Sequence, residues 1–226
     1  MDLVAQQSAE RRERVLETAR RLIAEHGYEG VGMRELARES RCSVPTLYKM
    51  FGDKGALLVA AVEHAFTGLL STIDRSHSER GSELLLAIFE GCYRELVRVP
   101  RYSRAVLAVF VSAGQTTELR DVVARHITAE IQVALERMRE QGELETWVDA
   151  RALAERMGSH LSSVNLEWAA GHLSDVALRA ALVYGASMML LGVARGEARR
   201  EFERLARELQ ADVVSPRQRQ RHAAGS

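Results

Sequence analysis

The chain has 226 residues, 46% of them hydrophobic, and its 31 basic side chains balance 31 acidic ones. It is long enough for one large domain or two small ones with a sizeable buried core, and its zero net charge excludes nucleic-acid binding by bulk attraction, so such binding would need a local basic surface. Two cysteines, Cys42 and Cys92, exclude both a disulfide framework and a zinc signature.

The N-terminal end and the longest apolar run bear on where the protein works. The sequence MDLVAQQSAERRER becomes charged before any apolar run, which is not typical of a signal peptide. The longest uncharged run, AALVYGASMMLLGVA at 180–194, has 15 residues, short of the ~20 that cross a bilayer. We therefore expect a cytoplasmic protein in which 180–194 form a buried helix.

Apolar side chains recur at helical spacing, and runs of alternating polarity that would indicate strands are absent from the sequence. The first apolar strip consists of Val15, Leu16, Ala19, Leu22 and Ile23. It predicts a helix that ends at Gly27 in a left-handed cap. Short helices are expected at 33–40 and 44–51, and a longer one from about Asp53. The sequence predicts an all-α protein of about nine or ten helices.

Capping signals mark the starts of the two short helices. Glu35 follows Gly32 by three residues, where its carboxylate can bond back to the free amides. Ser43 can accept hydrogen bonds from the first amides of VPTLYKMF. Two short helices joined by a turn of three or four residues, with the small Ala37 where they cross, describe a helix-turn-helix.

The second short helix has an apolar face and a polar one. Val44, Leu47 and Phe51 share the apolar face. The opposite face presents Pro45, Thr46, Tyr48 and Lys49, and the only other lysine, Lys54, begins the next helix. Hydroxyl groups suit phosphate oxygens, and a lysine can reach a base edge or the DNA backbone. The sequence therefore predicts a helix that enters the major groove.

These residues resemble the TetR-type (TetR/AcrR) transcriptional regulators. The likeness runs from about Arg11 to Phe66, and its most specific part is TLYKMFGDKGALL, similar to the family's TLYxxFxxKxxLL. The resemblance implies a dimeric regulator, usually a repressor, that binds a palindromic operator. It assigns the contacts with double-stranded DNA to Arg34, Ser43, Val44, Pro45, Thr46, Tyr48, Lys49 and Lys54. Of these, Thr46, Tyr48 and Lys54 would hold phosphates, and Arg34, Val44, Pro45 and Lys49 would lie in the groove.

Three positions depart from the family's usual pattern. Gly32 stands where a threonine commonly caps the second helix, and Gly55 where glutamate is usual. Arg41 replaces the glycine usual in the turn, at a backbone position that prefers positive φ, which strains it by ~1 kcal/mol. These departures bear on the docking and on the base sequence that is read.

Five helices are expected between residues 70 and 212, with the last two long. The helix that holds 180–194 is apolar on all sides and must be covered on all sides. Either it is the central core helix of its own chain, or a second copy supplies part of the cover. The family dimerises through its last two long helices, which implies a homodimer interface with these residues: Ala177, Ala181, Gly185 and Met188.

The resemblance also implies a pocket for a small apolar effector, without a cofactor or a metal ion. The candidate pocket residues are Phe66, Phe89, Cys92, Tyr93, Phe110, Met157, His160 and Leu161. For His160 the commoner alternative is a core histidine bonded to a neighbour. The predicted domains are 8–66 for DNA binding and 67–212 for effector binding and dimerisation, with a disordered tail at 213–226.

Two other functions stay open from the sequence. One is a helix-turn-helix regulator without a small-molecule ligand. The other is a helical enzyme, for which the sequence offers little: the HExxH, GxSxG and GxxxxGK[ST] motifs are absent, and no nucleophile has a discernible base. We therefore expect no enzymatic activity.

Overall fold

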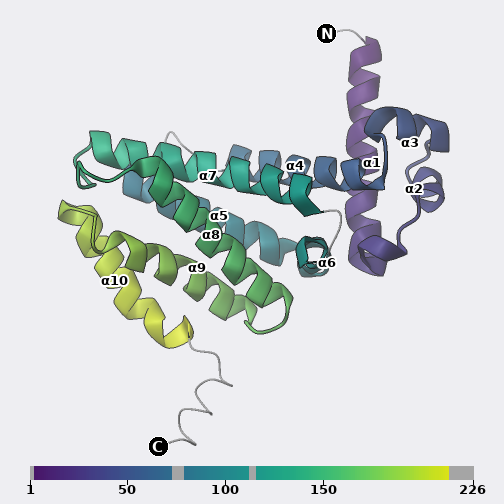
Figure 1. Ribbon diagram of the computed structural model, residues 1–226. Coiled ribbons are helices and arrows are strands. Elements are labelled where there is room, and N and C mark those ends of the chain that lie inside the picture. The colour runs from purple at the N-terminus through teal and green to yellow at the C-terminus, as the bar shows by residue number, and fades with distance from the viewer. Residues whose placement is uncertain (1–2, 73–78, 112–115, 214–226) are drawn as a thin grey trace, which may run out of the picture. The chain divides into compact units, whose positions relative to one another are not determined.

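The computed structural model describes residues 3–72, 79–111 and 116–213, and these form ten helices (Figure 1). In chain order they are α1 (Leu3–Gly30), α2 (Met33–Glu39), α3 (Val44–Phe51), α4 (Lys54–Thr72), α5 (Gly81–Arg98), α6 (Pro100–Val111), α7 (Thr116–Glu140), α8 (Ala150–Ala169), α9 (Asp175–Leu190) and α10 (Gly196–Val213). Within these ranges the one β-type pairing is an isolated bridge between Leu144 and Ala194. The predicted all-α fold is confirmed.

Packing divides the chain into two compact units. The N-terminal unit comprises 1–70 and 99–123, and the C-terminal unit comprises 71–98 and 124–226. This division differs from the boundary predicted at residues 66 and 67, because α6 packs with the N-terminal helices. Tyr102 of α6 is buried in their core, and the guanidinium of Arg20 lies 5.2 Å from its ring. The predicted tail, except Val213, lies outside the described residues.

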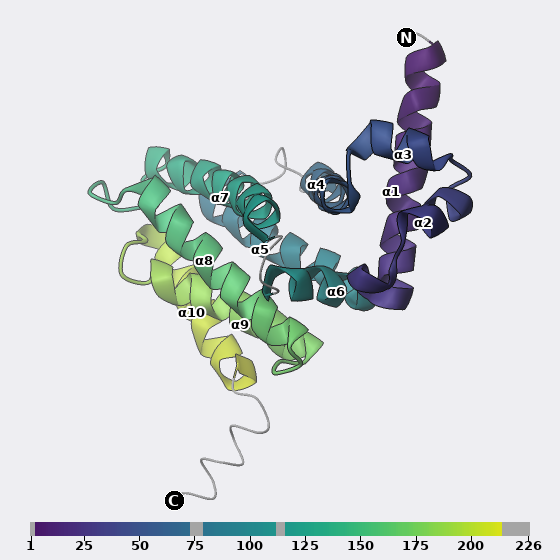
Figure 2. The ribbon, with the colours of Figure 1, turned by 45° about the vertical axis from the view of Figure 1, so that its right-hand side comes forward.

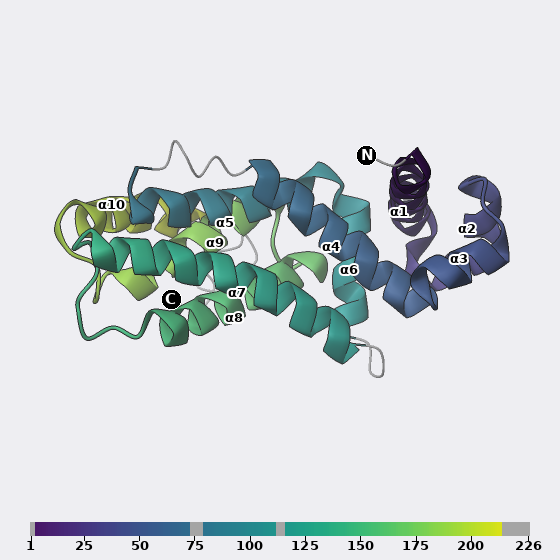
Figure 3. The same cartoon turned by 90° about the horizontal axis from the view of Figure 1, so that it is seen from above.

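Helix α1 is the backbone of the N-terminal unit. All five residues of its predicted apolar strip are buried, and Leu36, Leu47 and Phe51 of the next two helices join them in one core. Figures 2 and 3 show α2 and α3 on one side of α1 and α6 on the other. The helix is broken at Gly27, where φ is 72° and ψ is 166°, as the sequence predicts. Glycine suits this place because a left-handed backbone costs other residues energy.

Helix α9 is the centre of the C-terminal unit. Figure 1 shows it between α8 and α10, and it also packs against α5, where Arg179 and Glu90 form a bidentate ion pair. Nine of its residues are buried within the single chain. This is the central core helix that the sequence left open as an alternative.

The expectation of five helices after residue 70 is wrong: the described residues hold six, α5 to α10. The chain turns after Leu190, and α10 begins at Gly196, whose φ is 57°. Ala198, Phe202 and Ala206, each four residues after the last, bury the inner face of α10. That spacing is visible in the sequence, but the preceding apolar run hides the turn.

One buried carboxylate joins several ends of the C-terminal unit. Glu143 accepts hydrogen bonds from Arg80 Nε at 2.5 Å, from the Ser82 amide at 3.0 Å and from Ser82 Oγ at 3.1 Å. Its carbonyl accepts from the amide of Arg195 at 2.7 Å. The start of α5, the loop after α7 and the turn before α10 therefore meet at Glu143.

Within the described ranges, none of the helices combines the length and the apolar character needed to cross a bilayer.

Candidate nucleic-acid interface

A short turn holds α2 against α3. The amide of Cys42 donates to the Ala37 carbonyl at 2.9 Å, and Ser40 Oγ donates to the Leu36 carbonyl at 2.6 Å. Between them Arg41 has a φ of 53°, the positive value expected at this position. Ala37 is buried, as a residue at a close crossing must be. The two short helices thus form the helix-turn-helix predicted from the sequence.

Ser43 fixes the start of α3. Its Oγ accepts from the amide of Thr46 at 3.2 Å and lies 2.7 Å from Thr46 Oγ1. This confirms the predicted cap. At the start of α2, Gly32 has no side-chain cap hydrogen bond, and the Glu35 carboxylate lies 3.9 Å from the Arg38 guanidinium. The bond expected from Glu35 back to the helix start is therefore not formed.

The predicted reading face is available to a ligand. Leu47 and Phe51 turn inward, whereas Pro45, Tyr48 and Lys49 on the other face of α3 are exposed, Tyr48 by 50%. The predicted DNA-contact residues at the ends of this surface are the exposed Arg34 and Ser43, and Val44 and Thr46 are half-buried. The N-terminal unit thus brings seven of the eight predicted residues to α2, the turn and α3.

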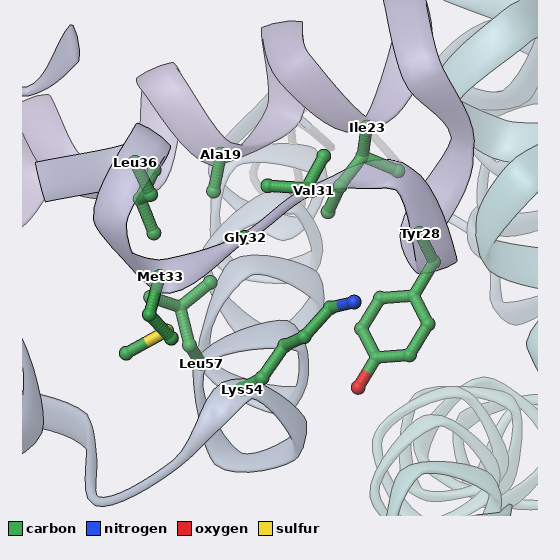
Figure 4. Close-up of a pocket in the computed structure, with 9 residues that line it drawn as sticks. All are labelled: Ala19, Ile23, Tyr28, Val31, Gly32, Met33, Leu36, Lys54 and Leu57. Atoms are coloured by element: carbon green, nitrogen blue, oxygen red, sulfur yellow. The ribbon is translucent and has the colours of Figure 1, made fainter. Parts of the chain in front are cut away.

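The eighth residue, Lys54, is held by its own unit. Its ammonium lies 4.3 Å from the centre of the Tyr28 ring, donates to the Glu29 carbonyl at 3.3 Å, and lies 3.9 Å from the Glu29 carboxylate. Figure 4 shows the lysine extended toward that ring. Burial, helped by the nearby carboxylates of Glu29 and Asp53, raises the pKa of Tyr28. Lys54 therefore joins the end of α1 to the start of α4.

A small hollow lies beside Lys54. It measures about 10 Å³ and is lined, as Figure 4 shows, by Ala19, Ile23, Tyr28, Val31, Gly32, Met33, Leu36, Lys54 and Leu57. A space of this size holds about one water molecule. It is too small for an organic effector.

The structure does not gather the eight predicted pocket residues in one unit. Phe89, Cys92, Met157 and Leu161 are buried, and Tyr93 and His160 half-buried, in the C-terminal unit. Phe66 and Phe110 belong to the N-terminal unit, and their side chains lie outside what the structure describes. Burial raises the pKa of the Cys92 thiol to about 12, so this thiol is neutral at physiological pH. None of the eight residues lines the hollow beside Lys54.

His160 and Gly185 pack together within one chain. His160 Nε2 lies 3.3 Å from the Leu182 carbonyl, and a Cβ placed on Gly185 would lie 2.1 Å from the imidazole. Glycine at 185 thus makes room for α8 of the same chain, where the sequence suggested a helix of a second copy. The histidine has the bonded core position that was the commoner alternative.

The other predicted interface residues differ in exposure. Ala177 and Ala181 are buried, whereas Met188 is 47% exposed. Met188 lines a groove of about 360 Å³ between α9 and α10. The remaining lining residues are Tyr184, Leu191, Arg199, Glu203, Ala206, Arg207 and Gln210, none of which is a predicted pocket residue. Sequence reasoning missed this groove because it did not separate α10 from the helix before it.

Comparison with known proteins places the helix-turn-helix in a family. Residues 15–61 match the family model described as bacterial regulatory proteins, tetR family. The match covers the core of α1, all of α2 and α3, and the start of α4. The chain belongs to the TetR family.

Relatives of known name support this TetR-family assignment. The repressor KstR of Rhodococcus jostii is 31% identical over 112 residues, which are 50% of this chain and 53% of that one. The chain thus spans about half the length of the curated relatives that it matches.

Solved structures extend the likeness to the whole TetR-family fold. A TetR transcription regulator from Haloarcula marismortui aligns with a TM-score of 0.69 at 16% identity, over 83% of this chain and 100% of that one. RolR in complex with resorcinol aligns with a TM-score of 0.64 at 20% identity, over 89% and 95%. At these identities the likeness shows the fold.

Proposed function

We propose that this protein is a transcriptional regulator that binds an operator as a homodimer and acts as a ligand-responsive repressor in the cytoplasm. The observation that carries the proposal is the exposed face of α3. Pro45, Tyr48 and Lys49 stand free of the core on a helix whose start is fixed by Ser43. The naming of KstR as a helix-turn-helix repressor agrees with it. We propose no enzymatic activity.

The residues divide by the part of DNA that they would reach. In a helix-turn-helix the second helix lies in the major groove and the first crosses the DNA backbone. Arg34, Val44, Pro45 and Lys49 are then assigned to the groove, and Thr46, Tyr48 and Lys54 to phosphates, with Ser43 at the start of α3. Lys54 would have to leave the Glu29 carbonyl, or share its ammonium with it, to bind a phosphate.

Direct titration tests the proposal. We expect the native protein to bind duplex DNA from upstream of its own coding sequence at least about a thousandfold more tightly than a scrambled duplex at physiological salt. Fluorescence anisotropy of labelled duplexes measures both affinities. Equal affinities for upstream and scrambled DNA, at several salt concentrations, would leave only nonspecific binding there and would count against a nearby operator.

For the effector we propose a small, apolar, uncharged molecule bound in the C-terminal unit near Phe89, Cys92 and Leu161. RolR, whose structure holds resorcinol, shows that a protein with this fold can bind such a compound. The effector must bind the DNA-incompetent form more tightly; a coupling of about 1–3 kcal/mol changes DNA affinity by about 5- to 150-fold. A compound that raises the melting temperature should therefore also weaken DNA binding in the same titration.

For the homodimer we propose the exposed side of α9 around Met188. Met188 is a large apolar residue in solvent, and Tyr184 and Leu191 beside it are half-buried. We expect Met188→Glu to shift the dimer toward monomer, because a buried carboxylate without a partner is costly. Sedimentation velocity measures this.

Val133→Glu is the matched control for the dimer, since Val133 is 46% exposed on α7. A dimer that survives Met188→Glu as it survives Val133→Glu would place the interface elsewhere. Gly185→Arg is unsuitable for this purpose, because it would collide with His160 of the same chain.

A further inference from the structure

Arg41 has an unusual backbone. Its φ of 53° is the only positive value at a non-glycine residue in the described ranges, whereas five glycines there have positive φ. Side chains with a Cβ are strained in this left-handed region, and arginine, unlike asparagine, gains no local hydrogen bond that offsets the strain.

The turn prevents Arg41 from relaxing. The Arg41 amide donates to the Arg38 carbonyl at 3.2 Å, and the Cys42 amide reaches the Ala37 carbonyl at 2.9 Å. Arg14 Nε also donates to the Ser40 carbonyl, at 3.1 Å. A right-handed backbone at residue 41 would break these bonds. The position therefore demands the conformation whichever residue stands there.

Within the described part of the chain, nothing holds the Arg41 side chain. It is exposed and makes no hydrogen bond or ion pair there. Nearby arginines differ: Arg38 lies 3.4 Å from the Glu39 carboxylate, and Arg21 lies 3.1 Å from it. The strain at Arg41 is thus offset by no contact in the free protein, while two guanidinium groups, those of Arg14 and Arg41, flank one turn.

The turn lies where a DNA backbone would pass. Arg41 precedes Ser43, the cap of α3, by two residues, so their Cα atoms are at most about 8 Å apart. The first helix of such a motif crosses the DNA backbone and the second enters the groove, so the connecting turn faces the phosphates at the groove edge. Guanidinium groups bind phosphates with two parallel hydrogen bonds.

We infer that Arg41 is a further DNA-contact residue, which binds a phosphate at the edge of the groove that α3 reads. The inference rests on the proposed function. A purely structural role is the competing explanation: a cation near the end of α2 interacts favourably with the helix dipole. The two explanations predict opposite effects on stability when the side chain is removed and the strain relieved.

The test is Arg41→Gly, measured for both stability and DNA binding. We expect the melting temperature to rise by about 2–4 °C, because glycine adopts the left-handed backbone freely. On upstream DNA we expect affinity to fall about tenfold, and the slope of log affinity against log salt to decrease by about 0.9 per protomer, or about two per dimer. Arg41→Asn, which also tolerates the backbone, should show the same loss of slope.

Arg101→Ala is the matched control, because Arg101 is an exposed arginine of α6, on the other side of α1 from the motif. It should leave the salt slope unchanged. An Arg41→Gly protein with native affinity and slope would overturn the inference alone, and so would a lowered melting temperature with unchanged DNA binding. Failure of the native protein to bind any DNA would overturn the proposed function and the inference with it.

Discussion

Glu143→Ala should lower the free energy of unfolding of the C-terminal unit by about 3 kcal/mol. The change removes the acceptor for Arg80 Nε, for the Ser82 amide and for Ser82 Oγ. Ser82 is 2% exposed, so its amide and hydroxyl cannot turn to water instead. A hydrogen bond to a charged group contributes about 1.5–3 kcal/mol, and a buried donor left without a partner adds a penalty. Urea titration measures the loss.

The chain carries its own probe for this experiment. Both tryptophans, Trp147 and Trp168, belong to the C-terminal unit, and Trp168 is fully buried, so tryptophan emission reports the unfolding of that unit. Glu145→Ala is the matched control in the same loop. Its carboxylate lies 3.5 Å from Arg195 Nε in an exposed pair, which contributes at most about 1 kcal/mol. Equal midpoints for the two variants would mean that Glu143 does not join these elements.

The helices of the N-terminal unit could be predicted because local signals decide them. Spacing of apolar residues marked α1, a serine cap marked α3, and Gly27 marked the break that the structure has there. Even the positive φ of Arg41 followed from its place in the motif. Each of these features depends on residues within one or two helical turns of each other.

Contacts between distant segments could not be predicted in this way. The small Gly185 correctly indicated a close approach, but spacing alone does not say which helix approaches, and it is α8 of the same chain. Lys54 fitted a phosphate anchor by position, yet the Tyr28 ring and the Glu29 carbonyl hold it, because the turn after Gly27 brings them beside it. The groove between α9 and α10 required the turn before Gly196, which an apolar run conceals.

Lys49→Ala and Lys54→Met should affect DNA binding differently. Lys49 is exposed on the reading face and is expected to reach a base edge, so its loss should cost about 1–3 kcal/mol per contact on the operator and much less on scrambled DNA. Lys54 is expected to touch phosphate, so its loss should weaken both complexes about equally and decrease the salt slope by about 0.9 per contact. Methionine keeps the side-chain stem against Tyr28, which alanine would not.

The ratio of affinities for upstream and scrambled duplex, compared between native protein and Lys49→Ala, tests most directly whether α3 reads DNA sequence. Anisotropy titrations of both proteins on both duplexes, at two or more salt concentrations, give this ratio together with the salt slopes. If α3 reads bases through Lys49, the ratio should fall by about ten- to a hundredfold in Lys49→Ala, as expected from losing such a contact. An unchanged ratio, with equal losses on the two duplexes, would mean that Lys49 touches only phosphate and would contradict its assignment as a reader of sequence.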